Sequence, residues 1–323
     1  MLTPKPRGSL SEAVFAALRA GLDTDHGPVW PTADADEDAA VSLWVLYELH
    51  YRGLDDVGDE LEWHPALLAL RHQLEGDLEA RLRARFPGRR SEGDFGEEFF
   101  GFVANHDGPS LAAHVQRDAD RDQVLELLRV RSIYHLKEAD PTAWVVPRLP
   151  VATKAALMEL LYDEYGVGDP NRLHAHLWAL GMEACGLESD YGAYIDEVPT
   201  EILEQNNAMS LFGLHRRLRG AALGHLAAFE ATSSMPSRRM AQGLERLDLP
   251  RAIVDYYTEH IEADAVHEQL AVRTVCGSLV AQEPGLTDDV YFGAFTCLDL
   301  ENRVAVRMLS RWGVLEGDEG AAA

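Results

Sequence analysis

The segment DYYTEHIEADAVHE, residues 255–268, places two histidines and an aspartate at positions i, i+4 and i+7. A helix turns by about 100° per residue, so His260, Asp264 and His267 share one face. Apolar residues such as Tyr257 continue the same stripe, which is typical of a face directed into a helical core. We therefore expect these three polar side chains to point inward.

Buried ionisable groups are costly unless they are paired or bound to a metal. Two imidazoles and one carboxylate form a ligand set suited to iron, manganese or zinc. The alternative is a hydrogen-bonded polar patch on a half-exposed helix, which is the usual environment of a single histidine. Three such residues in register favour a metal site.

The rest of the chain also shows helical spacing, and alternating β-branched runs are scarce, so the predicted fold class is all-α. Asp169-Pro170 and Pro236-Ser237 have the residue types found where helices begin. The predicted helices span residues 11–21, 37–52, 65–86, 110–136, 153–165, 171–185, 200–230, 237–246, 250–281 and 288–311.

The chain has 323 residues and a net charge of -25, with 29 Lys and Arg against 54 Asp and Glu. This balance opposes binding to nucleic acid or to anionic membranes. No apolar run is long enough to span a bilayer. The three cysteines are widely spaced and form no CxxC pair, which is typical of reduced thiols, so we expect a cytoplasmic protein.

Several known motifs are absent from the sequence. His267-Glu268 begins an HExxH pattern, but Ala271 occupies the position of the second histidine. Gly166-Val-Gly168 lacks the third glycine of a dinucleotide fingerprint, and there is no Walker A sequence. A ferritin-like diiron bundle requires two Glu-x-x-His pairs, whereas Asp264-Ala-Val-His267 is a single Asp-based analogue. Further ligands must come from other segments.

Two other places can supply these ligands. Glu230 follows an apolar helix side, so its carboxylate is expected in the core near a helix end. Glu164 ends one predicted helix and His174 lies just inside the next, with glycine and proline between them that allow the chain to bend. Asp163 is an alternative to Glu164, and His176 is an alternative to His174.

This set resembles the haem-oxygenase-like diiron oxidases and oxygenases, also described as iron-containing redox enzymes. The likeness runs over roughly residues 120–312 and includes the phrases SIYHLKEADP, DEYGVG, SLFGLHRRLRGAALGHLAAFE and EHIEADAVHEQLA. The His-x3-Asp-x2-His pattern is its most specific part. The metal ligands that the resemblance implies are Glu164, His174, Glu230, His260, Asp264 and His267.

The resemblance implies a haem-oxygenase-like helical bundle that holds two irons and uses O2 as co-substrate. It favours oxygenation of the nitrogen of a small amine or amino-acid-type metabolite. One alternative is desaturation or C–C cleavage of an amino or fatty acid, and a second is a metal-free protein that binds a small molecule. We expect the partner to be a small-molecule substrate. A homodimer is a further expectation.

Residues 1–90 are predicted to form an N-terminal helical extension, and residues 91–323 the haem-oxygenase-like diiron domain. The stretch 86–96 between them is rich in glycine and charge. The apolar run 43–47 needs cover, from an extra helical layer or a dimer contact. Candidate pocket residues are Met209, Phe212, Leu223 and Tyr256 or Tyr257, and candidates for binding a substrate carboxylate are Arg216, Arg217 and Arg219.

Overall fold

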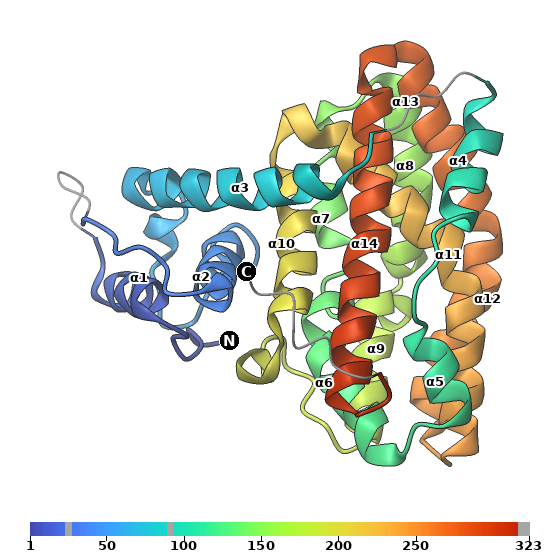
Figure 1. Ribbon diagram of the computed structural model, residues 1–323, viewed down its shortest axis with the longest axis horizontal. Coiled ribbons are helices and arrows are strands. Elements are labelled where there is room, and N and C mark those ends of the chain that lie inside the picture. The colour runs from blue at the N-terminus through green and yellow to red at the C-terminus, as the bar shows by residue number, and fades with distance from the viewer. Residues whose placement is uncertain (23–27, 89–92, 316–323) are drawn as a thin grey trace.

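The computed structural model describes residues 1–22, 28–88 and 93–315, and of residues 262–266 it describes only the backbone. Every regular element in these ranges is a helix, and they contain no β-strand (Figure 1). The predicted all-α fold is therefore confirmed for the part of the chain that the structure describes.

The helices form a bundle with a smaller N-terminal layer against one side (Figure 1). The layer consists of α1 (Ser9–Ala20), α2 (Asp36–Glu48) and α3 (Pro65–Arg85). The bundle consists of α4 (Phe95–Ala104), α5 (Leu111–Arg117), α6 (Arg121–His135), α7 (Asp140–Ala143), α8 (Val151–Glu164), α9 (His174–Ala184), α10 (Thr200–Leu214), α11 (Arg219–Arg246), α12 (Arg251–Gln269), α13 (Gly277–Gln282) and α14 (Thr287–Arg311). A π-helical segment, Leu270–Cys276, joins α12 to α13.

Helix α11 is the central element of the bundle, since it packs against α5, α12 and α14. Its contact with α14 is backbone to backbone. A Cβ on Gly224 would lie 1.8 Å from the carbonyl oxygen of Val290, and a Cβ on Gly293 would lie 1.9 Å from the carbonyl oxygen of Ala221. Glycine at both positions allows the two helices to approach this closely.

The N-terminal layer covers one side of the bundle. Residues 43–47 of α2 are all buried, so their apolar face is covered within the chain. Side chains of the layer share one hydrophobic cluster with Ile133 of α6, Ile202 of α10 and Met308 of α14. The prediction of an extra helical layer is therefore confirmed, whereas the domain division at residue 90 and the dimer stay predictions.

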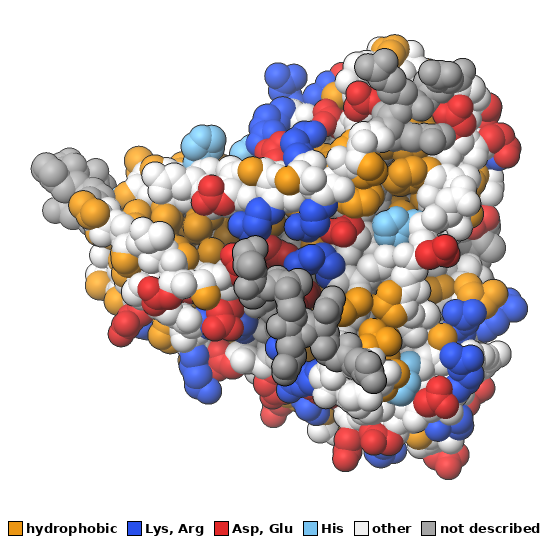
Figure 2. Space-filling view, in the orientation of Figure 1, with side chains coloured by type: hydrophobic (Ala, Val, Ile, Leu, Met, Phe, Trp, Pro, Cys, Tyr) orange, Lys and Arg blue, Asp and Glu red, His pale blue; other side chains and the backbone are white. Residues whose placement is uncertain are grey.

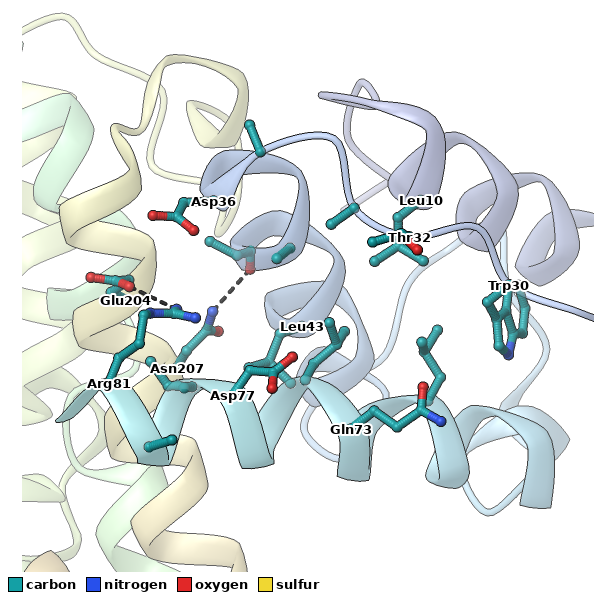
Figure 3. Close-up of a pocket in the computed structure, with 18 of the residues that line it drawn as sticks. Leu10, Trp30, Thr32, Asp36, Leu43, Gln73, Asp77, Arg81, Glu204 and Asn207 are labelled. Carbon is teal, nitrogen blue, oxygen red and sulfur yellow. Dashed lines mark hydrogen bonds and ion pairs between the residues drawn. The ribbon is translucent and has the colours of Figure 1, made fainter. Parts of the chain in front are cut away.

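A cleft of about 670 Å³ remains between α2, α3 and α10 (Figure 3). At one end of the cleft, Arg81 of α3 donates a hydrogen bond to Glu204 of α10 at 2.9 Å. Beside it, the amide Nδ2 of Asn207 donates to the carbonyl oxygen of Ala40 at 2.9 Å. These two contacts tie α10 to both α3 and α2.

Two predicted helices are broken in the structure. The helix predicted over residues 110–136 is wrong, because the chain breaks between α5 and α6 at residues 118–120. The Asp120 side chain accepts a hydrogen bond from the backbone N–H of Gln123, and this capping box begins α6. The helix predicted over residues 200–230 is also wrong. It breaks at His215, and a short 3-10 turn precedes α11.

The predicted helix start at Pro236 is also wrong. Helix α11 continues through Pro236, whose ring nitrogen carries no hydrogen to pair with the carbonyl oxygen of Thr232. Glu230, expected near a helix end, therefore lies well inside α11. Helix α4 was not predicted, and the Asp94 side chain caps it by accepting from the backbone N–H of Glu97.

The surface carries charges of both signs. On the face shown in Figure 2, basic side chains are interspersed among the acidic ones. Among the described residues, no helix combines the length and the apolar character that a membrane span requires.

Candidate metal centre

Helix α12 directs His260 and His267 into the bundle, where both are buried. One nitrogen of each ring forms a hydrogen bond that orients the ring. His260 Nδ1 lies 2.8 Å from the carbonyl oxygen of Tyr256, and His267 Nε2 lies 3.2 Å from Asp163 Oδ2. Because these oxygens are acceptors, His260 Nε2 and His267 Nδ1 are the nitrogens left for a metal. The side chain of Asp264 lies outside the described residues, so its role stays a prediction.

A tight reversal between α8 and α9 brings Glu164 and His174 together. Gly166 has a φ of 71°, and a Cβ at this position would lie 2.5 Å from the backbone nitrogen of Leu173. Only glycine fits both conditions. As a result, His174 Nδ1 lies 3.0 Å from Glu164 Oε2. The two residues therefore converge as the glycines and proline between them indicated.

Glu230 reaches the same region from α11 and is 5% exposed. Its Oε2 lies 3.6 Å from His267 Nδ1, and Glu164 Oε1 lies 3.7 Å from the same nitrogen. One ligand atom from each of these three residues lies within 4.8 Å of the others. Glu164, Glu230 and His267 thus form a first cluster with the donors of a metal site.

Glu138 completes a second cluster, and it was not among the predicted ligands. It lies in the turn after α6, with its Oε1 3.8 Å from His260 Nε2 and 4.0 Å from His174 Nδ1. Glu138, His174 and His260 also offer ligand atoms within 4.8 Å of one another. The available signal was its position just after a helix, which is similar to that of Glu164 at the end of α8.

Two neighbouring side chains hold the Glu138 carboxylate in place. His135 Nδ1 lies 3.2 Å from Glu138 Oε2, and the Tyr256 hydroxyl donates to the same oxygen at 3.3 Å. His135 Nδ1 and the Tyr256 hydroxyl are themselves 2.9 Å apart. Such partners orient a carboxylate toward a bound metal.

Glu164 joins the two clusters. Its Oε2 faces His174 of the second cluster, and its Oε1 faces His267 of the first. The Nδ1 atoms of His174 and His267 are buried and face carboxylate oxygens, that of Glu164 at 3.0 Å from His174 and that of Glu230 at 3.6 Å from His267. Carboxylate oxygens and imidazole nitrogens are donors that iron accepts, so these residues fit two adjacent metal ions.

The carboxylates also set the charge of the histidines. Burial opposes protonation of His260, but Glu138 outweighs burial and raises the pKa of His260 to about 10. In the same way Glu230 outweighs burial and raises the pKa of His267 to about 9. Burial alone would raise the pKa of Glu138, yet its contacts with His135 and His260 hold that pKa well below its usual range. A site this negative favours divalent cations as well as protons.

Metal binding should release protons and strengthen as the pH rises. The carboxylates raise the pKa values of His260 and His267 above 7 in the metal-free protein, and a metal binds only neutral imidazole, so loading at pH 7 should release at least two protons per chain. Between about pH 6 and pH 8 the affinity of each cluster for Zn²⁺ should increase about tenfold per pH unit. Calorimetry in buffers of different ionisation enthalpy measures the released protons.

The metal-free protein should respond to pH in the opposite direction. An unfolded histidine has a pKa of about 6.5. The raised pKa values therefore stabilise the metal-free fold fully below about pH 6.5, and this contribution is lost as the pH rises through 9 to 10. In the calorimetric experiment, Zn²⁺ binding to the His267→Ala variant should release one proton fewer than Zn²⁺ binding to the wild type. Zinc binding without proton release would contradict the charge state assigned to the site.

A small cavity is lined by residues of both clusters, and a larger cavity shares one lining side chain with it. The first, of about 30 Å³, is lined by Glu138, Glu164, Glu230, His260 and Met209, among others. The second is larger, about 280 Å³, and lies between α5, α6, α11, α12 and α14. Phe229 of α11 lines both, and the larger cavity is also lined by His135, whose Nδ1 lies 3.2 Å from Glu138 Oε2.

The alternative ligands lie outside the two clusters. Asp163 binds the outer nitrogen of His267, and His176 is only half-buried and belongs to neither cluster. The candidate arginines line neither cavity beside the clusters. Arg217 pairs with Glu79, and Arg219 pairs with Glu283. Of the candidate pocket residues, Met209 lines the small cavity, Tyr257 lines the larger one, and Phe212 and Leu223 lie in the hydrophobic core.

The helical bundle and its buried carboxylate–histidine clusters are matched by a known family. The family model for iron-containing redox enzymes matches residues 125–302, which is more than half of the chain. The chain belongs to this family, and the haem-oxygenase-like fold with an N-terminal helical region is confirmed.

A curated relative shares the same region. Nitrosourea synthase from Streptomyces achromogenes subsp. streptozoticus is 27% identical over 177 residues. The aligned part covers 54% of this chain and 38% of the relative, so this chain matches less than half of the length of that protein.

Proposed function

We propose that the chain is a non-haem diiron enzyme that uses O2 to oxidise the nitrogen of a small amine or amino-acid-type metabolite. When bound, two ferrous ions supply the electron transfer to O2 that amino-acid side chains cannot provide. Glu138, His174 and His260 would hold one ion, and Glu164, Glu230 and His267 would hold the other.

The position of Glu164 carries the proposal. One carboxylate with an oxygen toward each cluster is the arrangement expected where two metals share a ligand. The relative supports the choice of nitrogen as the oxidised atom, because a nitrosourea contains a nitroso nitrogen. Asp264 lies between the two histidines on α12, four residues after His260 and three before His267. We include it in the proposal as a further ligand.

The larger cavity is our candidate for the substrate site. Its volume of about 280 Å³ suits a metabolite, and its walls are largely apolar with a few polar side chains, as is usual for small-molecule sites. Arg131 contributes the main positive charge and lies 3.0 Å from Glu301 and 2.9 Å from Gln205. An α-amino acid carries both charges at its head, so this paired cation and anion would complement it.

The part of α11 around Pro236 contributes polar residues to this cavity. Thr232, Ser233 and Pro236 all line it. Since Pro236 has no N–H to donate to the carbonyl oxygen of Thr232, we expect this oxygen to be an acceptor for a substrate N–H. These residues would orient an amine near Phe229, the side chain that lines both cavities.

The proposal predicts iron binding and nitrogen oxidation together. After anaerobic loading with Fe²⁺, we expect about two irons per chain and a visible absorbance on exposure to O2, because each cluster offers three donors. Incubation with a panel of amino acids and amines under ¹⁸O2 should give a product with ¹⁸O on nitrogen, detected by mass spectrometry.

The control is the same incubation with His267→Ala, which should lose the absorbance and keep its helical content. Fewer than one bound iron per chain with no absorbance would contradict a diiron centre. A product that has lost two hydrogens or a carbon fragment, with no ¹⁸O on nitrogen, would favour desaturation or C–C cleavage instead.

A further inference from the structure

A buried ion pair connects the N-terminal layer to the turn that carries Glu138. Lys137 follows α6 and is 6% exposed, and Glu48 at the end of α2 is 1% exposed. Lys137 Nζ donates to Glu48 Oε1. The Tyr191 hydroxyl donates to the same oxygen at 2.9 Å. The two charges are therefore paired with each other inside the protein.

Aromatic rings enclose the ammonium group. Lys137 Nζ lies 4.1 Å from the ring centre of Tyr51 and 5.3 Å from that of Tyr191. The Tyr51 hydroxyl lies 3.0 Å from Ser210 Oγ of α10. Because a cation is attracted to the face of an aromatic ring, these contacts hold the ammonium group in one place.

The backbone of Lys137 is held as firmly as its side chain. Its N–H donates to the carbonyl oxygen of Tyr134, and its carbonyl oxygen accepts from the N–H of Asp140. Asp140 in turn accepts from the hydroxyl of Tyr165, the residue after Glu164. Lys137 is thus the residue at which the turn, the layer and the neighbouring helix end are joined.

Burying a charge pair costs desolvation free energy, and an apolar pair would fill the same space without that cost. The pair is adjacent in the chain to Glu138, whose carboxylate must reach His174 and His260. We propose that the Glu48–Lys137 ion pair is a positioning device, through which the N-terminal layer fixes Glu138 at the metal centre. This inference rests on the metal centre proposed above.

The test is the double variant Glu48→Gln with Lys137→Met, which removes both charges and leaves neither unpaired. Titration of the full-length chain with Co²⁺, followed by visible absorbance and calorimetry, should show two sites in the wild type. In the double variant we expect one site to bind about 10–100-fold more weakly, the loss typical of a residue that orients a metal ligand. The other site should keep its affinity and its spectrum.

A matched control uses a second ion pair between the layer and the bundle, one that lies away from the turn of Glu138. Arg81→Met with Glu204→Gln removes the Arg81–Glu204 contact at the cleft in Figure 3, which adjoins no residue of the two clusters. This variant should bind both Co²⁺ ions as the wild type does. An equal loss in this control would show that the effect is general loosening and would overturn the proposal.

Two further variants make the test specific. If the double variant does not fold, Tyr191→Phe removes only the hydroxyl that holds Glu48 and should weaken the same site. In a Glu138→Ala background, neutralising the pair should not change Co²⁺ binding further. Wild-type affinities for both ions in the charge-neutral and Tyr191→Phe variants would overturn the inference. Failure of the wild type to bind two Co²⁺ ions would instead overturn the diiron proposal.

Discussion

Replacing Glu138 with alanine should remove one of two bound metal ions and abolish oxidation. Glu138 is the carboxylate that the second cluster contributes, with His174 and His260 as its nitrogen donors. Two imidazoles without this carboxylate would bind a ferrous ion weakly. We expect the affinity of that site to fall by more than about 100-fold, because loss of a residue that merely orients a ligand already costs about 10–100-fold.

The loss should be specific to the second cluster. Glu159→Ala, on the exposed side of α8, is a matched control that removes a carboxylate without touching either cluster. Metal content measured after Fe²⁺ loading and gel filtration should fall from about two ions to about one in Glu138→Ala and stay unchanged in Glu159→Ala. Circular dichroism checks that the helices remain. Two tightly bound irons in Glu138→Ala would remove Glu138 from the proposed ligand set.

The part of the site on α12 could be predicted, because the relevant residues are close together in the sequence. His260 and His267 are seven residues apart on one helix, and helical periodicity alone places them on one buried face. Glu164 and His174 are nearly as local, since Gly166 allows the reversal that joins them. The structure divides these four residues between the two neighbouring clusters, His174 and His260 in one and Glu164 and His267 in the other.

Glu138 could not be predicted in the same way, because it lies in a turn where no periodicity applies. Its approach to His260 depends on how α6 packs against α9, and the preceding Lys137 pairs with Glu48 from a distant part of the chain. Packing of this kind has no signature within a short window of sequence. Judged by residue type alone, many other glutamates are equally good candidates for a metal ligand.

Errors in the predicted helices have separate physical causes. The break before α6 does have a local signal, because Asp120 and Gln123 form a capping box that is visible in the sequence. The continuity of α11 through Pro236 was not marked, because a proline usually ends a helix. Packing against α5, α12 and α14 keeps α11 helical despite the lost hydrogen bond. Tertiary contacts override local preference here, and they place Glu230 inside the bundle.

The close contact between α11 and α14 leads to a second prediction with a large effect. A Cβ on Gly293 would lie 1.9 Å from the carbonyl oxygen of Ala221, which is backbone and cannot rotate away. Gly293→Ala must therefore push the two helices apart along their contact. We expect a loss of about 3 kcal/mol in the free energy of unfolding, at the upper end of the usual cost of overpacking.

The matched control is Gly277→Ala, because Gly277 is also helical but has room for a side chain. Its φ is -58°, and a Cβ there would lie 3.7 Å from the nearest atom, the carbonyl oxygen of Val272. Alanine at this position should stabilise the protein by about 0.5–1 kcal/mol, since glycine loses more backbone entropy in a helix. The midpoint of urea denaturation should therefore decrease in Gly293→Ala and increase in Gly277→Ala, each relative to the wild type.

The effect of Gly293→Ala should extend to the metal centre. Helix α11 carries Glu230 and Phe229, so a shift of α11 moves one ligand of the first cluster and the side chain shared by both cavities. Co²⁺ binding by folded Gly293→Ala should weaken at the first cluster, whereas Gly277→Ala should bind as the wild type. Equal stability and equal Co²⁺ affinity in the two variants would mean that α11 is not positioned by this glycine contact.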